Sequence, residues 1–500
     1  MSRKGLLFLF LLCFATSYLF AQVAMPLKNS TNNELLYRPN FHFTPKKGWM
    51  NDPNGMIFLN GQYHLFYQHY PDATVWGPMH WGHATSKDLV RWVHQPIALY
   101  PDSIGMIFSG SAVLDQHNTS GLGRNGIAPL VAIFTQHHMP GEKAGRTDFQ
   151  NQSIAYSLDE GKTWIKYAGN PVLKTPGLKD FRDPKVIWHA PTKKWIMSLA
   201  VADHVEFYSA PDLIHWTKES EIGKGQFAHG GVWECPDLLH FNVQGKTIWV
   251  LLVSMNPGGP NGGSATQYIV GDFDGHTFKP FTEAIKWMDY GPDNYAGVTF
   301  SNLGDRNILI GWMSNWNYAN TVPTENWRSA MTLPRELSLV EQNAKASNHA
   351  TKDYILLSRP VQELNAGFVK VNAKDPIVPN RFELRDLKAI DFEIVLSNAH
   401  NEKLSIGYNA HKKQFFIDRT QAGLSNFNEG FAAVALAPRL SNALNVDLSI
   451  ILDKTSVELF ADGGRTVMTA LFFPTQPFTK WEFISKEKMP SSAIQLYNHQ

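Results

Sequence analysis

Short apolar runs separated by tight turns cover most of the chain, and this pattern predicts strands rather than helices. One unit recurs, in which a polar cluster leads into an apolar strand, a two-residue turn and a second apolar strand. The first copy begins with the polar cluster Asn51 to Asn54, runs on to Leu59, turns at Asn60-Gly61 and returns through Tyr63 to Tyr67. Asn-Gly between two apolar runs is a strong hairpin signal. The unit therefore predicts an antiparallel pair whose first strand starts with polar residues.

Further copies of this inner hairpin follow along the chain, each with its own start. They begin at Arg182-Asp183-Pro184, at Glu234-Cys235-Pro236-Asp237, near Gly297 and around Phe108-Ser109-Gly110-Ser111. A second, outer hairpin accompanies them, with an Asp that can bond the turn backbone and an aromatic residue that fills the space between sheets. It occurs at Ser86 to Trp92, Ser157 to Trp164, Pro211 to Trp216 and, loosely, Asp272 to Phe278.

Four strands per unit, repeating every roughly 50 to 75 residues, are typical of propeller blades. Five starts predict a five-bladed β-propeller over residues 36–340, and a single β-sandwich with coincidental turns is the alternative. The stretch from Gln342 to Asp353 is polar, so we predict a linker over 341–360. Alternating strands without polar starts follow, which predicts a C-terminal β-sandwich over 361–500. The predicted fold is all-β.

The N-terminus has the order of a secretory signal. Arg3 and Lys4 precede an apolar run from Leu6 to Phe14, and the small residue Ala21 follows. We therefore expect residues 1–21 to be a signal peptide and the protein to be exported, to the periplasm or beyond. A membrane anchor is the alternative, although the run is shorter than the ~20 residues that a span needs.

The charge balance narrows the range of partners. Lys and Arg number 45 against 44 Asp and Glu, so no basic field attracts nucleic acid or an anionic membrane. Removal of the signal peptide leaves Cys235 as the one cysteine, without neighbours at metal-ligand spacing. Several histidines lie close together in sequence between His64 and His83, but strand alternation would point them to different sides, which does not favour a metal site. We predict no disulfide, no metal and no organic cofactor.

The polar starts carry the candidate chemistry. In a propeller the first strand of each blade lines the central channel, and the starts of these strands converge at one mouth. Asp52, Asp183 and Glu234 would therefore face one another. Carboxylates at close range shift each other's pKa, so that one can stay ionised as a nucleophile while another is held protonated as an acid. Glycosidases require this arrangement.

The surroundings of these carboxylates suit a sugar. Flat aromatic faces favour the C–H faces of carbohydrates, and they are supplied by Trp49, Trp76, Trp81, Phe108, Trp233, Trp312 and Trp316. Hydrogen bonds to hydroxyl groups could come from Asn51, Gln68, Ser109 and Arg182. Each residue alone also has a structural interpretation, as a turn former, a core aromatic or a local ion pair. Their occurrence at equivalent points of successive units favours a binding site.

Three segments resemble the motifs of glycoside hydrolase family 32, which contains invertases, inulinases and levanases. They are Trp49 to Gly55, Phe181 to Lys185 and Trp233 to Leu238, in the family's order. The resemblance covers nearly the whole mature chain and implies a five-bladed propeller followed by a β-sandwich. It implies that Asp52 is the nucleophile, Glu234 the acid/base and Asp183 a transition-state stabiliser. Contacts to a terminal fructose are implied for Gln68, Trp76, Phe108, Ser109, Arg182 and Trp312.

The resemblance also bears on the substrate. Gly311 to Tyr318, Val322 to Thr324 and Leu333 to Leu337 look like the levanase and exo-inulinase branch more than the plant invertases. This implies release of terminal fructose from levan or inulin, with sucrose as a side substrate. Endo-levanase, invertase, fructosyltransferase and a non-catalytic fructan-binding propeller are the alternatives. The sequence carries no signal of oligomeric state.

Overall fold

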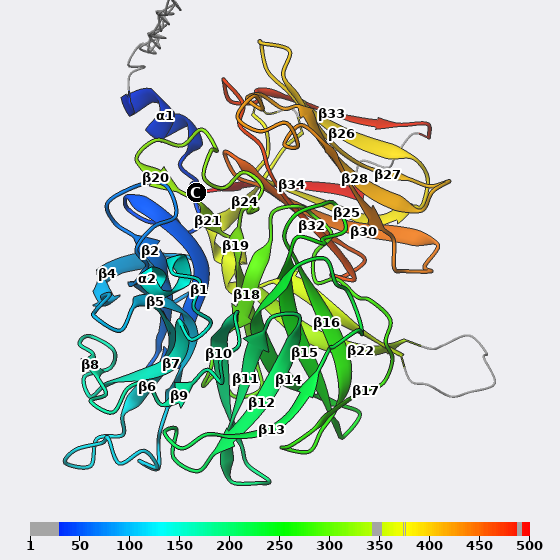
Figure 1. The fold of residues 1–500 in the computed structure, drawn as a ribbon. Helices are drawn as coiled ribbons and strands as arrows, with labels where there is room; N and C mark the ends of the chain where they lie inside the picture. Colours follow the sequence, from blue (N-terminus) through cyan, green and yellow to red (C-terminus); the bar gives the residue numbers. More distant parts are fainter. Residues whose placement is uncertain (1–29, 343–352, 374, 376, 488–492) are drawn as a thin grey trace, which may run out of the picture.

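The computed structural model describes residues 30–342, 353–373, 375, 377–487 and 493–500 (Figure 1). The predicted signal peptide at 1–21 lies outside these residues. Strands dominate the described part, in agreement with the all-β prediction, and its helices are α1 (Ser30–Tyr37), α2 (Met139–Lys143) and the 3-10 helix η1 (Gln362–Gly367). None of the described helices has the length and apolarity needed to cross a membrane.

Five sheets, in which most neighbouring strands are antiparallel, form the part of the chain before residue 361. The first contains β1 (Gly48–Leu59), β2 (Gln62–Tyr70), β3 (His80–Ser86), β4 (Trp92–Leu99) and, parallel to β1, β20 (Trp327–Arg328). The second contains β5 (Met106–Leu114), β6 (Leu130–His137), β7 (Gln150–Ser157), β8 (Ile165–Lys166) and β9 (Leu173–Lys174). The third contains β10 (Phe181–His189), β11 (Lys194–Val201), β12 (His204–Ala210) and β13 (Thr217–Ile222).

The fourth and fifth sheets repeat this plan. The fourth contains β14 (Val232–Val243), β15 (Lys246–Asn256), β16 (Ala265–Phe273) and β17 (Phe278–Pro280). The fifth contains β18 (Tyr295–Thr299), β19 (Asn307–Met313), β21 (Ala330–Met331), β22 (Arg335–Gln342) and β23 (Asp353–Pro360). The first strands of the five sheets contact one another in the order β1, β5, β10, β14, β18, and β18 contacts β1 again. The polar starts of these strands are therefore arranged around one centre.

The strand β23 corrects one sequence prediction. Residues 341–360 were expected to form a linker, but Asp353–Pro360 pairs with β22 along its whole length, from Gln342 opposite Asp353 to Arg335 opposite Pro360. Tyr354 and Leu356 pack into the core between the fourth and fifth sheets. The apolar run in β23 is thus a buried strand, and the polar stretch before it misled the prediction.

Two further sheets form the C-terminal part, and their strands are coloured from yellow to red in Figure 1. One has the order β24 (Phe368–Val371), β34 (Ile494–His499), β25 (Arg381–Lys388), β30 (Asn445–Leu452), β31 (Ser456–Ala461) and β32 (Thr466–Leu471). The other has the order β29 (Val434–Pro438), β28 (Gln414–Gln421), β27 (Lys403–Asn409), β26 (Phe392–Ser397) and β33 (Lys480–Ser485). The two sheets share one apolar core, to which Phe382 and Leu448 contribute from the first and Ile406 and Ile417 from the second.

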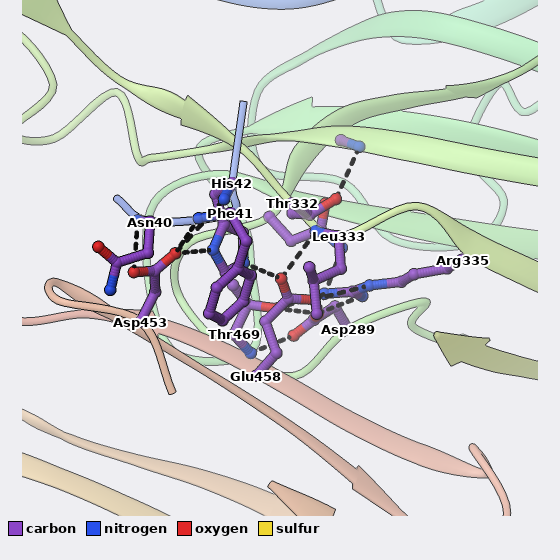
Figure 2. A network of polar contacts seen from close by, with 12 residues as sticks. Asn40, Phe41, His42, Asp289, Thr332, Leu333, Arg335, Asp453, Glu458 and Thr469 are labelled. Atoms are coloured by element: carbon purple, nitrogen blue, oxygen red, sulfur yellow. Dashed lines mark hydrogen bonds and ion pairs between the residues drawn. The ribbon is translucent and has the colours of Figure 1, made fainter. Parts of the chain in front are cut away.

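A buried ionic network joins the two parts of the molecule (Figure 2). The Arg335 guanidinium pairs with Asp289 and with Glu458 of β31. Nδ1 of His42 lies 2.8 Å from Asp453 Oδ2, and Nε2 lies 2.9 Å from Glu458 Oε1. Burial acts to lower the pKa of His42, but hydrogen bonds and the charges of both carboxylates raise it to about 9. The network therefore contains a cationic histidine at neutral pH.

Candidate active site

The three carboxylates come from the starts of three first strands. Asp52 lies on β1, Asp183 on β10 and Glu234 on β14. Cys235 connects the first two, because its Sγ lies 3.5 Å from Asp52 Oδ2 and 3.6 Å from Asp183 Oδ2. The backbone N–H of Cys235 also donates to Asp183 Oδ2 at 3.1 Å. Residues far apart in sequence thus meet at one point.

Local irregularities in these strands aim the side chains. The strand register shifts between Met50 and Pro53 in β1, between Arg182 and Lys185 in β10, and between Glu234 and Asp237 in β14. Each shift contains a proline, which has no N–H to donate and so suits a break in the ladder. Bulges of this kind re-aim side chains beside active sites. The Asx-Pro and Cys-Pro pairs in the sequence therefore have a structural reason.

Asp52 is buried and hydrogen-bonded at both oxygens. The Ser109 hydroxyl donates to Oδ2 at 2.6 Å, and the Asn51 amide donates to Oδ1 at 3.0 Å. Asn51 is itself held by the Trp49 indole N–H at 2.7 Å. Burial and the negative charge of Glu234 raise the pKa of Asp52 to about 6, while these hydrogen bonds act in the opposite direction.

Glu234 is the more accessible acid, with 22% of its side chain exposed against 5% for Asp183. Its Oε1 accepts two hydrogen bonds from Arg182, from Nε at 3.1 Å and from Nη2 at 2.9 Å. Its Oε2 accepts a short hydrogen bond from the Tyr295 hydroxyl. Both oxygens are therefore fixed by donors while one face remains open.

Asp183 is more deeply buried than Asp52 and Glu234. Its backbone N–H donates to the Thr135 hydroxyl at 3.0 Å, and Arg182 Nε lies 3.9 Å from its Oδ2. Burial raises the pKa of Asp183, the Arg182 charge opposes this, and the charges of Glu234 and Asp52 add to the rise. The three carboxylates cannot all ionise at low cost, so this cluster holds a proton more readily than isolated acids do.

Four of the predicted sugar-contacting residues differ in how deeply they are buried. Trp76 and Phe108 are half-buried, with ring centroids 6.1 Å apart, and Phe108 stacks on His137 at 4.3 Å. Trp312 is fully buried beside Trp49 and Trp316, and within the described residues its indole N–H has no acceptor. Gln68 is also buried and donates to Asn54 at 2.7 Å. Of Trp76, Phe108, Trp312 and Gln68, the first two form part of the accessible surface.

Two residues at the site escaped the sequence reasoning. Tyr295 was not singled out, although it directly precedes the predicted start near Gly297. Cys235 was considered as a cysteine without metal-ligand neighbours; it is buried, and its thiol lies between two acids. Neither could be recognised from residue type, because both roles depend on contacts between different sheets.

A group with metal-ligand geometry lies elsewhere among the described residues, at His204, Glu206 and Glu221. The Lys218 ammonium already bonds both glutamates. The Lys218 ammonium thus supplies the positive charge that offsets the two carboxylates, as in a structural ion-pair cluster.

Comparison with known proteins finds relatives that match nearly the full length of the chain. The model of the glycosyl hydrolases family 32 N-terminal domain matches residues 42–350, and that of the C-terminal domain matches residues 341–498. The levanase of Bacillus subtilis (strain 168) is 45% identical over 466 residues, which cover 88% of this chain and 66% of the levanase. The chain thus spans slightly less than two thirds of that relative. An extracellular exo-inulinase of Aspergillus niger is 40% identical over 495 residues, covering 90% of this chain and 92% of the relative.

Solved structures agree with these matches. The crystal structure of exo-inulinase from Aspergillus awamori has a TM-score of 0.81 at 36% identity and covers 93% of this chain and 98% of its own. The fructofuranosidase of Schwanniomyces occidentalis complexed with fructose has a TM-score of 0.79 at 32% identity and covers 93% and 97%. Both family models match in sequence order and together span nearly all described residues. The chain belongs to glycosyl hydrolases family 32.

Proposed function

We propose that the protein is a retaining β-fructofuranosidase that releases terminal fructose from fructans such as levan or inulin, and also cleaves sucrose. The observation that carries this proposal is the meeting of Asp52, Asp183 and Glu234, with donors on both oxygens of Glu234. Relatives named levanase and exo-inulinase support the fructan substrate.

The proposed architecture is a five-bladed propeller followed by a β-sandwich. The cyclic contacts of β1, β5, β10, β14 and β18 support the propeller, and the shared core of the two C-terminal sheets supports the sandwich. With β23 included, the propeller domain runs from residue 36 to 360 and the sandwich from 361 to 500. We further propose that residues 1–21 direct export, which the similarity to an extracellular exo-inulinase of Aspergillus niger supports.

In the proposed reaction Asp52 attacks C2 of the terminal fructosyl unit. The C2–O bond breaks, and the leaving oxygen takes the proton of Glu234. A fructosyl ester of Asp52 results. Water then gives a proton to Glu234 and its oxygen to C2, which frees Asp52 and releases fructose with retained configuration. Retention requires the two carboxyl groups to lie about 5–5.5 Å apart.

The remaining site residues bind the sugar in this proposal. Asp183 and Arg182 bond fructose hydroxyls, and the negative charge of Asp183 stabilises the positive charge that develops at C2. Trp76 and Phe108 face the sugar from the accessible side. Hydrogen bonds and packing around the same unit come from Asn51, Gln68, Ser109 and Trp312. The reaction uses no metal and no organic cofactor.

Chromatography of the products from levan, inulin and sucrose tests the proposal. Asp52→Asn should abolish fructose release, whereas Asp212→Asn, in an outer turn of the third sheet, should retain it. Fructose as the sole early product from a fructan would establish exo action. Early oligosaccharides would show endo action, and cleavage of sucrose alone would show an invertase. Unchanged activity of Asp52→Asn would remove Asp52 from the mechanism.

A further inference from the structure

Residues 289–295 lead into β18, the first strand of the fifth sheet, but their hydrogen bonds reach the C-terminal sheets. We infer that these sheets, through Arg419 and β32, position the acid/base carboxylate of Glu234. The inference rests on the proposed role of Glu234 in the reaction. It gives the C-terminal part a function in catalysis without any contact to substrate.

The segment makes hydrogen bonds to the edge of the six-stranded sheet. β32 is the last strand of that sheet, and such an edge offers free backbone groups. The Tyr290 N–H donates to the Val467 carbonyl at 2.8 Å, and the Asp293 N–H donates to the Thr469 carbonyl at 3.2 Å. Between them, a Cβ added to Gly291 would lie 2.1 Å from the Thr469 carbonyl oxygen. The segment thus lies tightly against β32, although it is not itself a strand.

Asp289 anchors the beginning of the segment, as Figure 2 shows. Its Oδ1 accepts the Thr469 N–H at 2.9 Å, and its Oδ2 accepts the Thr469 hydroxyl at 2.6 Å. The Arg335 guanidinium donates to the same Oδ2 at 2.8 Å. The buried charge of Asp289 is therefore compensated from both parts of the molecule.

Asp293 anchors the end of the segment and is fully buried. Its Oδ2 accepts Nη1 of Arg419 at 2.8 Å and the Leu471 N–H at 2.8 Å. Its Oδ1 accepts the Tyr318 hydroxyl at 2.5 Å, and that hydroxyl also accepts Nη2 of Arg419 at 3.1 Å. Removing one partner of a buried ion pair leaves the other charge uncompensated, so Arg419 is the cation on which this anchor depends.

Tyr295 follows Asp293 by two residues and carries the effect into the site. Its ring is fully buried, and its hydroxyl donates to Glu234 Oε2. Ala296 continues with a positive φ of 53° and donates its N–H to the Ser254 hydroxyl at 3.1 Å. Tyr295 therefore lies between two fixed residues. Asp293 is bonded to the C-terminal part of the molecule, and Ala296 is bonded to Ser254 of β15, in the same sheet as Glu234.

Loss of Arg419 should displace Tyr295, whose hydroxyl orients the Glu234 carboxyl group. Glu234 would then no longer be held where it can deliver its proton to the leaving oxygen. Attack by Asp52 does not use this proton, whereas departure of a sugar alkoxide does. A fructoside with a p-nitrophenolate leaving group needs little protonation. The defect should therefore depend on the leaving group, which a general loss of folding would not.

The experiment compares kcat on sucrose and on p-nitrophenyl β-fructofuranoside for folded variants. We expect Arg419→Met to lose about tenfold or more on sucrose, but less than about threefold on the nitrophenyl fructoside. Tyr295→Phe should show the same bias, and the double variant should lose little more than Tyr295→Phe alone. Arg439→Met, which breaks a buried pair with Asp462 inside the C-terminal part, is the matched control and should show no bias.

Tyr318→Phe provides a milder variant if Arg419→Met does not fold, since it removes only the hydroxyl between Asp293 and Arg419. It should show the same bias to a smaller extent. Equal losses on both substrates, or additive losses with Tyr295→Phe, would overturn the inference while leaving the proposed function intact. A wild-type protein inactive on both substrates would overturn the proposed function, and the inference with it.

Discussion

Asp52 is subject to opposing influences, because burial favours its neutral form and hydrogen bonds favour its charged form. Ser109 supplies the shortest of these bonds, at 2.6 Å. Ser109→Ala should raise the pKa of Asp52 above its present value of about 6. A hydrogen bond to a charged group contributes about 1.5 kcal/mol, so the acidic limb of kcat/KM should move up by roughly one pH unit.

The pH profile of kcat/KM on sucrose checks this prediction. A nucleophile must be ionised, so wild-type activity should fall as pH decreases through about 6. Ser111→Ala is the matched control, since Ser111 lies on the same strand but donates to the Pro184 carbonyl. An acidic limb that stays in place in Ser109→Ala would contradict the assignment.

Cys235 lies in surroundings that disfavour a thiolate. Burial and the charges of Asp183, Asp52 and Glu234 raise the pKa of its thiol well above the usual range. Alkylation by iodoacetamide requires the thiolate, so the native protein should resist the reagent at pH 8 and the denatured protein should react. Mass spectrometry of the peptide that contains Cys235 measures both. Rapid labelling of the native protein would show that the thiol is accessible.

Single residues were predictable where a motif of neighbouring residues marks them. Asp52 and Glu234 each stand in a run of polar residues and proline at a strand start, which the chain repeats. Tyr295 carries no such mark, because its role is created by a contact with another sheet. The full burial of Trp312 was equally hidden, since sequence cannot tell a ligand platform from a core aromatic.

The strand β5 is closely packed at the point where it presents Ser109. A Cβ on Gly110 would lie 2.0 Å from the Ile133 carbonyl oxygen and 2.6 Å from Phe134 Cα. Gly110→Ala should therefore destabilise the protein by about 1–3 kcal/mol and lower activity by displacing Ser109. Gly430→Ala should be neutral, because its nearest neighbour is a side-chain oxygen at 3.4 Å. Thermal unfolding and kcat of both variants test this.

Strands and hairpins were predicted well where turn chemistry and apolar runs coincide, as at Asn60-Gly61 between β1 and β2. The failure at β23 has a physical reason. Its partner β22 ends before a polar stretch, and local polarity was interpreted as the end of a domain. Pairing across such a stretch is a tertiary property. The register shifts at the strand starts could not be predicted for the same reason. Once seen, the shifts explain why prolines occur at these positions.

The junction between the two parts should make the stability of the molecule depend on pH. The pKa of His42 is about 9 in the folded protein against an ordinary value of 6.5. This stabilisation is fully present below pH 6.5 and is lost as pH rises through about 9. It amounts to about 3 kcal/mol. His42→Gln should therefore flatten the decline of Tm between these pH values.

Thermal unfolding of both proteins from pH 6 to 10 measures this effect. A decline equally steep in His42→Gln would assign it to other groups. The network could not be predicted from sequence, because His42 and its partners Asp453 and Glu458 are more than 400 residues apart. The predictable part of the molecule is thus its local units, and the unpredictable part is the contact between distant ones.

The pairing of β20 with β1 sets the order in which the molecule can be completed. Gly48 and Trp49, just before Asp52, pair with a strand made at Trp327–Arg328. Asp293, two residues before the Tyr295 that bonds Glu234, accepts the N–H of Leu471. During translation all three carboxylates are therefore added to the chain long before the residues that arrange them. We therefore expect hydrolysis to begin only after the last of these partners has been added to the chain.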